Sequence, residues 1–555
     1  MTAVVFAALS APSLLGWLLL IGAFAGVFQA LRAEPSPPRG VDWKWWLLIL
    51  GILLTFRWPL ICQLYEIHQD ESVLMAGAMT LRHDPVFWRS VDGATAGPLN
   101  FYALLPAVFA PGLIPFAMTR ITAVLLIWGA IMAVGETLAL KTSRVVARSA
   151  VLPLILFESF TTSVELAHYS TELVPNFLLM GGAYGVARQS RRPSRRGLWL
   201  TSFLLGAVPF AKLQAIPIAA AIWLFLVVQE IRAGRKSCLP QLLIVSLLPT
   251  LAVSSLVVFT GETENLIIPY FLNNLAYAQA GRESLAPVVA QLWSYGLVEG
   301  FIPLLFIGSG LGLLPGVMLA QTASGSHRRL ALAALGLLVI ATACALAPHR
   351  EYPHYLNFML PPLALLSGAA LAVTLGVAPT HGAQMKRAHV LLALFLLSAA
   401  APQIALRASN RPDRFSPAFR SSEPSEAHRQ LSDLVRTLGR RGEALGLWGW
   451  RSSLYVETGL HQATRQAHTE SQFKAGPLQP YFLRRYLADL QASRPPVFVD
   501  TAGPGNFRFD DRGLGHQQFP QLRDWVGAHY TLVADIDGVR VYARNDRAAA
   551  FKPGP

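Results

Sequence analysis

The sequence predicts a mainly α-helical, polytopic membrane protein with about twelve transmembrane helices and a small C-terminal α/β domain outside the cytoplasm. Two observations predict this class: the composition of the chain and the spacing of its long apolar runs. Of the 555 residues, 53% are hydrophobic and only 14% are charged, and the mean hydropathy is +0.42. Soluble domains usually carry about 25% charged residues. Most of this chain is therefore expected to lie in lipid.

Apolar runs long enough to cross about 30 Å of hydrocarbon recur along the chain. The first run has no basic residue before it and is too long for the apolar part of a signal peptide, so it is counted as a helix. The predicted spans are residues 3–30, 44–62, 117–139, 149–167, 174–188, 197–211, 214–230, 240–259, 299–319, 329–347, 356–376 and 388–406.

Basic residues indicate which connections face the cytoplasm. Clusters such as 141–148 and 188–196 recur in every second connection, and this set carries about three times as many Lys and Arg residues as the other set. Because cytoplasmic loops hold the excess of positive charge, the basic connections are assigned to the cytoplasm and both termini to the outside. The net charge of +14 then reflects membrane topology, and no nucleic-acid partner is predicted.

The predicted topology divides the chain into four parts. Residues 1–43 hold an extra N-terminal helix with a cytoplasmic loop, and residues 44–407 form the main transmembrane domain, with a long first outer loop at 63–116. Residues 408–425 are rich in Arg, Ser and Pro and are predicted to be a linker. Residues 426–555 form the outer α/β domain, because predicted helices and strands alternate there.

Within that outer domain the periodicity and the turn residues define each element. A hairpin turn is predicted at Asp537-Gly538. The predicted helices are 426–440, 478–493 and 520–529, and the predicted strands are 444–450, 496–500, 530–534 and 539–543.

A short apolar segment lies inside the first outer loop. Residues 98–112 are too few to span the membrane, and Pro106 interrupts them. If they did span, the later basic clusters would change sides and the charge bias would be lost. They are therefore predicted to lie in the outer interface as a helix, with Asn100, Phe101 and Tyr102 near the lipid head groups.

The first outer loop also carries two adjacent carboxylates shortly after a predicted membrane helix. These are Asp70 and Glu71, and His68 precedes them. Such a pair is costly because like charges repel and desolvation disfavours the charged form. Both conditions suit a general base that accepts a hydroxyl proton. The structural alternative is a solvated loop in which Asp70 caps a helix.

A second outer turn holds His168, Tyr169 and Glu172, and Glu165 lies seven residues before Glu172. That separation places the two carboxylates on one face if the helix continues. A second outer carboxylate could orient an acceptor or share the role of base. The alternative is an ordinary interfacial end of two helices.

Positive charge on the outer face is sparse. Lys212 lies between two apolar runs, where a cation should be paired or should bind an anion. Arg350 lies in another short outer turn, and the planar fork of an arginine suits a phosphate. The same turn holds Tyr352, His354 and Tyr355. The alternatives are snorkelling of Lys212 to the interface and pairing of Arg350 with a neighbouring acid or with lipid head groups.

Several short motifs follow one another between residues 44 and 400. They are Arg57 near the end of the first of these helices, the Asp70-Glu71 pair, Gly97-Pro98-Leu99-Asn100-Phe101-Tyr102, Thr119-Arg120-Ile121, the spacing from Gly206 to Lys212, and the segment PHYLNFMLPP at 353–362. The order of these motifs, and the side of the membrane on which each is predicted to lie, are similar to those in the GT-C superfamily of polytopic glycosyltransferases. This superfamily includes the protein mannosyltransferases of family 39 and bacterial aminoarabinose and galacturonic acid transferases.

The resemblance implies a GT-C-type membrane glycosyltransferase. Its donor would be a sugar on a polyprenyl phosphate, and an acceptor hydroxyl would attack the anomeric carbon with inversion. The first-loop acid of the family matches Asp70, with Glu71 beside it, as the base or the group that orients the acceptor. The second-loop acid matches Glu172, where many relatives carry Asp.

The resemblance also suggests which residues bind the donor phosphate. Some relatives place a lysine before the interfacial helix, but Ala96 and Gly97 occupy that place here. Phosphate binding is therefore expected from Lys212, Arg350 or Arg120. Contacts to the acceptor or the sugar are expected from His68, Tyr102, His168, Tyr169, Tyr352, His354 and Tyr355.

The expected partners are a polyprenyl-phosphate sugar, a lipid, glycan or protein acceptor, and the membrane itself. The expected location is the cell (inner or plasma) membrane, with the catalytic face and the C-terminal domain outside the cytoplasm. No residue spacing matches a zinc signature, so no metal site is predicted. Relatives differ in metal dependence, which leaves a divalent cation open.

Two alternatives come from other functional classes. A secondary transporter would place polar sites near the bilayer midplane in two related halves. Glu136 and Glu158 fit that reading, whereas the charges at the outer rim and the lack of an internal repeat do not. A non-catalytic envelope assembly protein, which recruits partners through its outer domain, is the second alternative.

Overall fold

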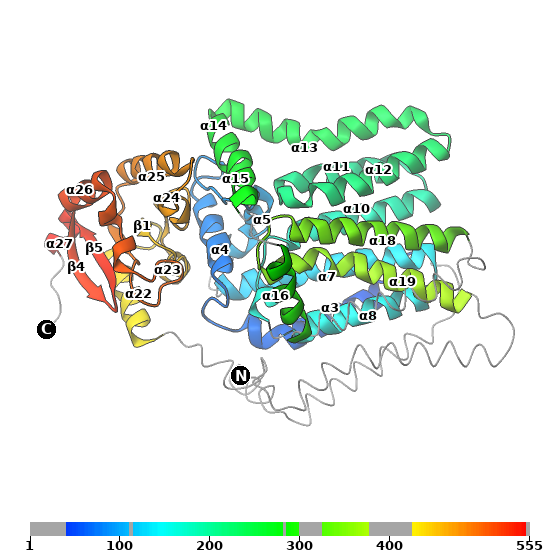
Figure 1. Ribbon diagram of the computed structural model, residues 1–555, viewed down its shortest axis with the longest axis horizontal. Coiled ribbons are helices and arrows are strands. Elements are labelled where there is room, and N and C mark those ends of the chain that lie inside the picture. The colour runs from blue at the N-terminus through cyan, green and yellow to red at the C-terminus, as the bar shows by residue number, and fades with distance from the viewer. Residues whose placement is uncertain are drawn as a thin grey trace, which may run out of the picture. The chain divides into compact units, whose positions relative to one another are not determined.

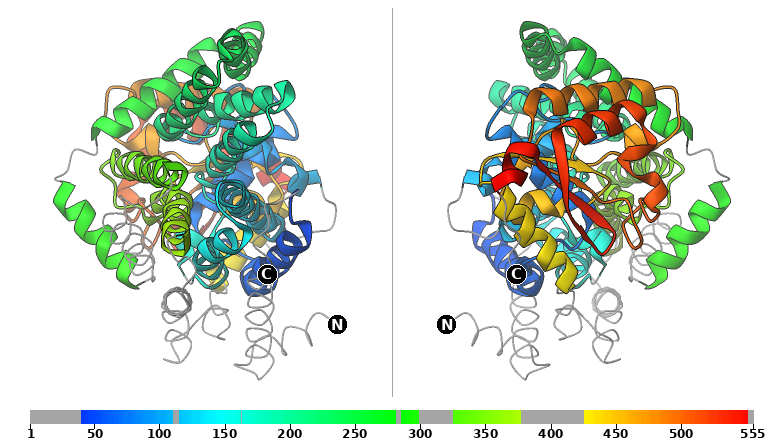
Figure 2. Two further views of the ribbon diagram at one scale, coloured as in Figure 1. Left: turned by 90° about the vertical axis from the view of Figure 1, so that its right-hand side faces the viewer. Right: turned by 90° about the vertical axis from the view of Figure 1, so that its left-hand side faces the viewer.

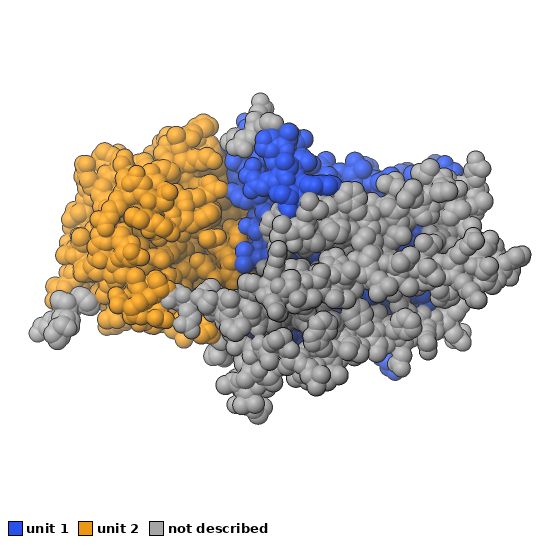
Figure 3. All heavy atoms as spheres, turned by 60° about the horizontal axis from the view of Figure 1, so that its bottom comes forward, with its two compact units in different colours: residues 1–62, 120–255, 276–421 blue, residues 63–119, 256–275, 422–555 orange. Residues whose placement is uncertain are grey.

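The computed structural model describes most of the predicted elements. The predicted spans 3–30, 299–319 and 388–406, and the linker up to residue 424, lie outside the described residues. Contacts group the chain into two compact units, which Figure 3 colours separately. The described residues are 40–109, 115–161, 163–280, 285–298, 325–376 and 425–550. Unit 1 comprises residues 1–62, 120–255 and 276–421, and unit 2 comprises residues 63–119, 256–275 and 422–555.

The described part of unit 1 consists of helices, and the long ones run side by side in Figure 1. Helix α18 packs against α19, α10 against α11, and α19 against α8. The α-helices are α3 (Trp43–Ile61), α7 (Pro115–Lys141), α8 (Arg144–Phe160), α9 (Val164–Ala167), α10 (Leu173–Arg191), α11 (Arg195–Ala207), α12 (Ile216–Arg232), α13 (Leu239–Thr260), α15 (Asn273–Ala280), α16 (Leu285–Val298), α18 (Gly325–Leu346) and α19 (Leu360–Gly376). Short 3-10 helices are η1 (Val208–Phe210), η2 (Leu213–Ala215), η3 (Lys236–Cys238) and η5 (Pro353–Phe358).

Five helices in the described part of the chain are long and apolar enough to cross a membrane. The predicted spans at α3, α8, α10 and α11 also form helices. This confirms a mainly helical chain with candidate membrane spans. The five candidate spans are Phe116–Lys141, Leu213–Arg232, Lys236–Thr260, Gly325–Leu346 and Pro353–Ala372.

Buried ion pairs and hydrogen bonds join the helices in the core of unit 1. The Arg57 guanidinium lies 2.8 Å from the Glu158 carboxylate and also donates to the Glu158 carbonyl at 2.7 Å. The Trp46 indole donates to Glu136 at 2.6 Å. A buried charge needs such a partner. Glu136 and Glu158, the two carboxylates that fitted a transporter, thus both bind helices together.

Unit 2 joins the first outer loop to the C-terminal residues. Its helices are α4 (Gln69–Leu81), α5 (Pro98–Tyr102), α6 (Leu105–Phe109), α14 (Thr263–Leu266), the π-helix η4 (Ile267–Leu272), α22 (Glu426–Leu438), α23 (Ser453–Thr458), α24 (Glu470–Phe473), α25 (Gln479–Ser493), η6 (Arg512–Leu514), η7 (His516–Gln518), α26 (Pro520–His529) and α27 (Asn545–Ala550). Its strands are β1 (Ala444–Trp448), β2 (His461–Gln462), β3 (Val497–Asp500), β4 (Tyr530–Ile536) and β5 (Val539–Arg544).

The five strands form one sheet in the order β2-β1-β3-β5-β4. Strand β1 pairs in parallel with β2 and β3, whereas β5 is antiparallel to β3 and β4. The predicted hairpin turn is confirmed: Asp537 and Gly538 have φ values of 51° and 83°, and a two-residue I′ turn requires positive φ at both positions. Helices α22 and α23 cover one face of the sheet, and α25 and α26 cover the other (Figure 2).

The first outer loop is part of the hydrophobic core of unit 2. Ala76 of α4 is buried in the cluster that α22, α23 and one face of the sheet form. Asp92 in the loop makes a buried ion pair with Arg485 of α25. Asn265 accepts hydrogen bonds from Tyr481 at 2.8 Å and from Arg465 at 3.2 Å. Three distant segments of the chain therefore fold together.

The predicted interfacial helix at 98–112 needs correction. The described part forms two short helices, α5 and α6, and the side chains of Asn100 and Phe101 are buried. A Cβ atom added to Gly77 would lie 2.5 Å from the Phe101 ring, and one added to Gly93 would lie 2.6 Å from it. The ring thus packs against two glycines in unit 2 instead of lying among lipid head groups.

Candidate functional site

Three turns of unit 1 converge on one end of its helices. One turn precedes α10, the second precedes α12, and the third connects α18 to α19. Short helices within these turns contact one another. The opposite ends of these helices carry basic residues. Helix α10 ends with Arg188 and Arg191, α12 ends with Arg232, and α18 begins near Arg328. The turns therefore meet at the end remote from the basic clusters.

A buried ion pair lies at the centre of these turns. The Lys212 ammonium donates to the Glu172 carboxylate and, at 2.7 Å, to the Thr171 hydroxyl. The two charged side chains are 5% and 0% exposed. The ammonium also lies 4.6 Å from the centroid of the Tyr355 ring. The break between α11 and α12, made of two 3-10 turns, directs the Lys212 side chain to this place.

The pairing changes the interpretation of Glu172. Burial raises the pKa of this carboxyl group, but the charges of Lys212 and His354 outweigh burial, and the net shift is downward. A carboxylate whose charged form is favoured is a poor proton acceptor. The sequence had suggested a role as a second base or an acceptor-orienting group. The geometry assigns Glu172 to holding Lys212 in position instead.

Aromatic and imidazole rings form one wall of the same site. The His354 imidazole bonds the Glu165 carboxylate at 2.7 Å. The His354 ring stacks on the ring of Tyr352, and it makes T-shaped contacts with the rings of His168 and Tyr355. The turns thus bring together the residues that the sequence singled out there. Tyr169 is also buried in this region.

Arg350 supplies the second cation of the site. Its guanidinium lies 4.9 Å above the ring of Tyr277, and the Tyr277 hydroxyl is 3.3 Å from that of Tyr355. The Nε and Nη2 atoms of Arg350 are inaccessible to water and have no hydrogen-bond partner among the described residues. Leaving buried donors unsatisfied is costly. These two N–H groups form the edge with which arginine binds an anion through two parallel bonds.

Arg120 has a different environment. It is 2% exposed, and its guanidinium donates to the carbonyl oxygen of Leu60 at 2.9 Å. This contact ties α7 to the C-terminal end of α3. The structure therefore gives Arg120 a role in helix packing.

The first-loop acids belong to unit 2 and differ from each other. Asp70 lies in the first turn of α4, and its side chain is 33% exposed. His68 caps this helix, because its Nδ1 atom accepts a hydrogen bond from the Asp70 amide at 3.2 Å. Glu71 is buried and accepts from the Ile67 amide at 3.3 Å. Asp70 is therefore the accessible acid of the pair.

Tyr102 is the remaining candidate residue of the first outer loop. The Tyr102 hydroxyl donates to the Pro85 carbonyl at 2.7 Å. That bond joins two parts of the loop, so it gives Tyr102 a structural task. Of the candidate residues, His68, Asp70, Glu71 and Tyr102 belong to unit 2, and all of the others belong to unit 1.

Sequence reasoning missed a second acidic cluster in unit 2. Burial, together with the nearby charges of Glu457 and Glu71, raises the pKa of Glu66 to about 7, against a hydrogen bond from Ser72. Glu457 in turn accepts from His428 at 2.8 Å. Glu66 and Glu457 are far apart in the sequence, so no local pattern signals their proximity.

Replacing Glu66 with Gln should remove a pH dependence of stability. The native protein keeps a proton on Glu66 between pH 4.5, its ordinary pKa, and about 7, whereas the unfolded chain has lost it. The free energy of unfolding should therefore fall as the pH rises through this window and level off above it. We expect Glu66→Gln to flatten this slope, a change on the order of 2 kcal/mol, in thermal unfolding from pH 4 to pH 8.

A matched control lies on α22. Arg429 holds the pKa of the exposed Glu426 carboxyl below its usual range, so Glu426→Gln should leave the slope between pH 4.5 and 7 in place. A slope that persists in Glu66→Gln would contradict the assignment.

Comparison with known proteins finds solved structures that resemble the chain. No protein-family model matches the chain, and no curated protein sequence matches it. Two crystal structures of the Archaeoglobus fulgidus oligosaccharyltransferase resemble it. The one tethered by a disulfide bond to an acceptor peptide with the NVT sequon is 12% identical, with a TM-score of 0.44, and the match covers 82% of this chain and 69% of that chain.

The second structure, a complex with zinc and sulfate, is 11% identical, with a TM-score of 0.44, and the match covers 82% of this chain and 67% of that chain. Similarity at this level carries no functional conclusion. The function is therefore inferred from the residues of the chain itself.

Proposed function

We propose that this chain is a membrane glycosyltransferase of the GT-C type. It moves a sugar from a polyprenyl-phosphate donor to a hydroxyl group of an envelope acceptor, with inversion at the anomeric carbon. The observation that carries the proposal is the buried donor edge of Arg350, which has no hydrogen-bond partner in the described part of the chain. It belongs to the converging turns that also hold the Lys212–Glu172 pair and an aromatic wall.

The position of the two cations suits a lipid-linked phosphate. Lys212 directly precedes the candidate span Leu213–Arg232, and Arg350 lies between the spans Gly325–Leu346 and Pro353–Ala372. A polyprenyl chain lies in hydrocarbon, so its phosphate must lie where such spans end. The positions of Lys212 and Arg350 at the ends of these candidate spans suit that depth.

The cations also suit the chemistry of the leaving group. When the bond between the anomeric carbon and the phosphate oxygen breaks, the electron pair moves to the departing polyprenyl phosphate. Charge therefore grows on oxygens that the Arg350 fork can bind through two hydrogen bonds. Glu172 holds the Lys212 side chain in position beside the same phosphate.

Asp70 is the proposed base. The acceptor oxygen attacks the anomeric carbon, and its proton passes to the Asp70 carboxylate as the new glycosidic bond forms. The exposure of Asp70 supports this role, because a base must reach its substrate. Glu71 is held inside unit 2 and supports the loop.

The charge distribution supports an orientation for the reaction. The basic ends of α10 and α12 are assigned to the cytoplasm by the excess of positive charge. The converging turns at the other ends of these helices then face outward. This places the chemistry on the extracytoplasmic side of the cell membrane, where envelope acceptors are found.

The proposal is tested by the Arg350→Lys variant in an assay of sugar transfer. Full-length protein in lipid nanodiscs is given radiolabelled polyprenyl-phosphate sugars and envelope extract as acceptor. Lysine keeps the charge but loses the planar fork, so we expect kcat/KM for the donor to fall about 100-fold. The matched control is Arg328→Lys on the exposed, opposite end of α18, which should transfer normally. Equal activity of both variants would refute the phosphate site.

A further inference from the structure

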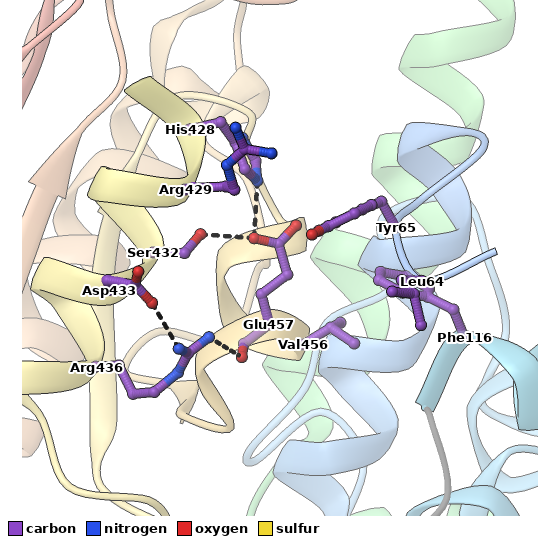
Figure 4. Close-up of a pocket in the computed structure, with 10 residues that line it drawn as sticks. All are labelled: Leu64, Tyr65, Phe116, His428, Arg429, Ser432, Asp433, Arg436, Val456 and Glu457. Carbon is purple, nitrogen blue, oxygen red and sulfur yellow. Dashed lines mark hydrogen bonds and ion pairs between the residues drawn. The ribbon is translucent and has the colours of Figure 1, made fainter. Parts of the chain in front are cut away.

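Unit 2 contains a cavity of about 330 Å³ that the proposed chemistry does not use. Helix α22 forms one side of it, and residues of the first outer loop form the other (Figure 4). Pockets for small ligands typically measure about 300–1,000 Å³. The cavity therefore has room for one or two sugar rings.

The floor of the cavity is a buried polar network. Glu457 accepts hydrogen bonds from Ser432 at 2.6 Å and from His428 at 2.8 Å. Figure 4 shows the Tyr65 hydroxyl pointing toward the Glu457 carboxylate from the opposite side. The floor thus holds hydroxyl, imidazole and carboxylate groups in fixed positions.

The rim of the cavity carries an exposed ion pair. Arg436 bonds Asp433 at 2.7 Å, and the two side chains are 53% and 70% exposed. Arg436 also donates to the Glu457 carbonyl at 3.2 Å. Exposed pairs of this kind contribute little stability, so both groups can exchange their mutual bond for bonds to a ligand.

The charges around the cavity indicate a neutral ligand. Two guanidinium groups, on Arg429 and Arg436, and two carboxylates, on Asp433 and Glu457, line the cavity. A polyanion or a polycation would meet as much repulsion as attraction. Sugar hydroxyls both donate and accept hydrogen bonds, so alternating donors and acceptors suit them. Tyr65 and Val456 offer apolar surface for the C–H face of a sugar ring.

The cavity also lies at a useful place in the chain. Its apolar wall includes Leu64, shortly after α3 ends, and Phe116, where a candidate membrane span begins. Glu66 lies close to both Glu457 and Glu71. The cavity is therefore near the membrane boundary and next to the segment that begins α4 with Asp70.

We propose that this cavity binds a neutral saccharide unit of the acceptor. The inference rests on the proposed transfer reaction, because it names the acceptor class for the same base. A sugar held by Glu457, Arg436 and Asp433 would present its remaining hydroxyls along the acidic segment toward Asp70. The acceptor is then a glycan or a glycolipid head group.

The test is direct binding, measured separately from transfer. Saturation-transfer NMR of full-length protein in nanodiscs uses the methyl glycosides of mannose, glucose and galactose, with inorganic phosphate as an anionic probe. We expect at least one glycoside to bind. Its affinity should fall about tenfold in the double variant Asp433→Asn/Arg436→Gln. Absence of glycoside binding, or binding of phosphate alone, would overturn the proposal.

Helix α26 offers a matched control. Arg523 and Asp524 form an equally exposed ion pair, with side chains 53% and 67% exposed. The double variant Arg523→Gln/Asp524→Asn removes the same groups away from the cavity and should bind glycosides as the original protein does. Equal loss in both double variants would show an effect on folding or charge and would overturn the assignment.

Two further experiments distinguish the possible acceptors from each other, and the proposed saccharide site from the proposed transfer reaction. Displacement of the glycoside by glucosyl-diacylglycerol in the nanodisc would support a glycolipid acceptor, and displacement by a soluble oligosaccharide would support a glycan. Asp70→Asn should abolish transfer but retain glycoside binding. If Asp433→Asn/Arg436→Gln retains glycoside binding while transfer continues, the saccharide site fails and the transferase stands. If Asp70→Asn transfers normally, the proposed reaction fails instead.

Discussion

Asp70→Asn should lower sugar transfer by about 1,000-fold, the middle of the range for loss of a general base. The amide keeps the size of the carboxyl group and the backbone N–H that His68 caps, but it cannot accept the acceptor proton. The loss should appear in kcat, with donor binding unchanged. Release of polyprenyl phosphate in nanodiscs measures turnover, and retention of the labelled donor measures binding.

Two other carboxylates of the first loop serve as controls. Asp84 pairs with Arg89 at 2.6 Å on the exposed side of the loop, so Asp84→Asn should transfer normally. Glu71 is buried and bonds the Ile67 amide, so Glu71→Gln should lower the melting temperature of the protein more than its turnover. Full transfer by a well-folded Asp70→Asn protein would refute the role of Asp70 as the base.

Lys212→Met should destabilise unit 1 by about 3–5 kcal/mol, because it leaves the Glu172 carboxylate buried without its counter-ion. Glu172→Gln should cost less, since a neutral amide can still accept from the ammonium. The double variant Lys212→Met/Glu172→Gln should recover most of the stability, because neither buried charge remains. Activity should not recover with it, since the cation for the donor phosphate is lost.

Chemical unfolding of the detergent-solubilised protein, read as a double-mutant cycle, measures this coupling. The exposed pair Arg523 and Asp524 provides the reference, where the coupling should stay below about 1 kcal/mol. Additive effects at Lys212 and Glu172 would show that the two side chains do not form the pair. A double variant with restored transfer would show that Lys212 does not serve the donor.

Much of the fold follows from local pattern. Apolar runs predict the membrane helices, and alternation with turn residues predicts the strands around Asp537-Gly538. These signals work because each depends on neighbours within one turn or one hairpin. The burial of Phe101 was not predictable, because the two glycines that accommodate its ring belong to other parts of the loop.

The candidate site was predictable in part. Lys212, Arg350 and the aromatic cluster near residue 354 could be identified because charge is rare at the ends of apolar helices. The partners of these residues could not be identified from the sequence. The pairing of Lys212 with Glu172, the position of Tyr277 beneath Arg350, and the proximity of Glu66 to Glu457 all depend on how distant segments pack.

The shared core of unit 2 has a consequence for biosynthesis. Ala76 and Asp92 find their partners on α22 and α25, which the ribosome makes roughly 350–400 residues later, tens of seconds at usual elongation speeds. During that delay the side of α4 that packs against the C-terminal residues lacks these partners. The newly made loop therefore exposes this surface until the C-terminal residues are made, and a nonsense mutation before α22 should yield a product prone to aggregation and proteolysis.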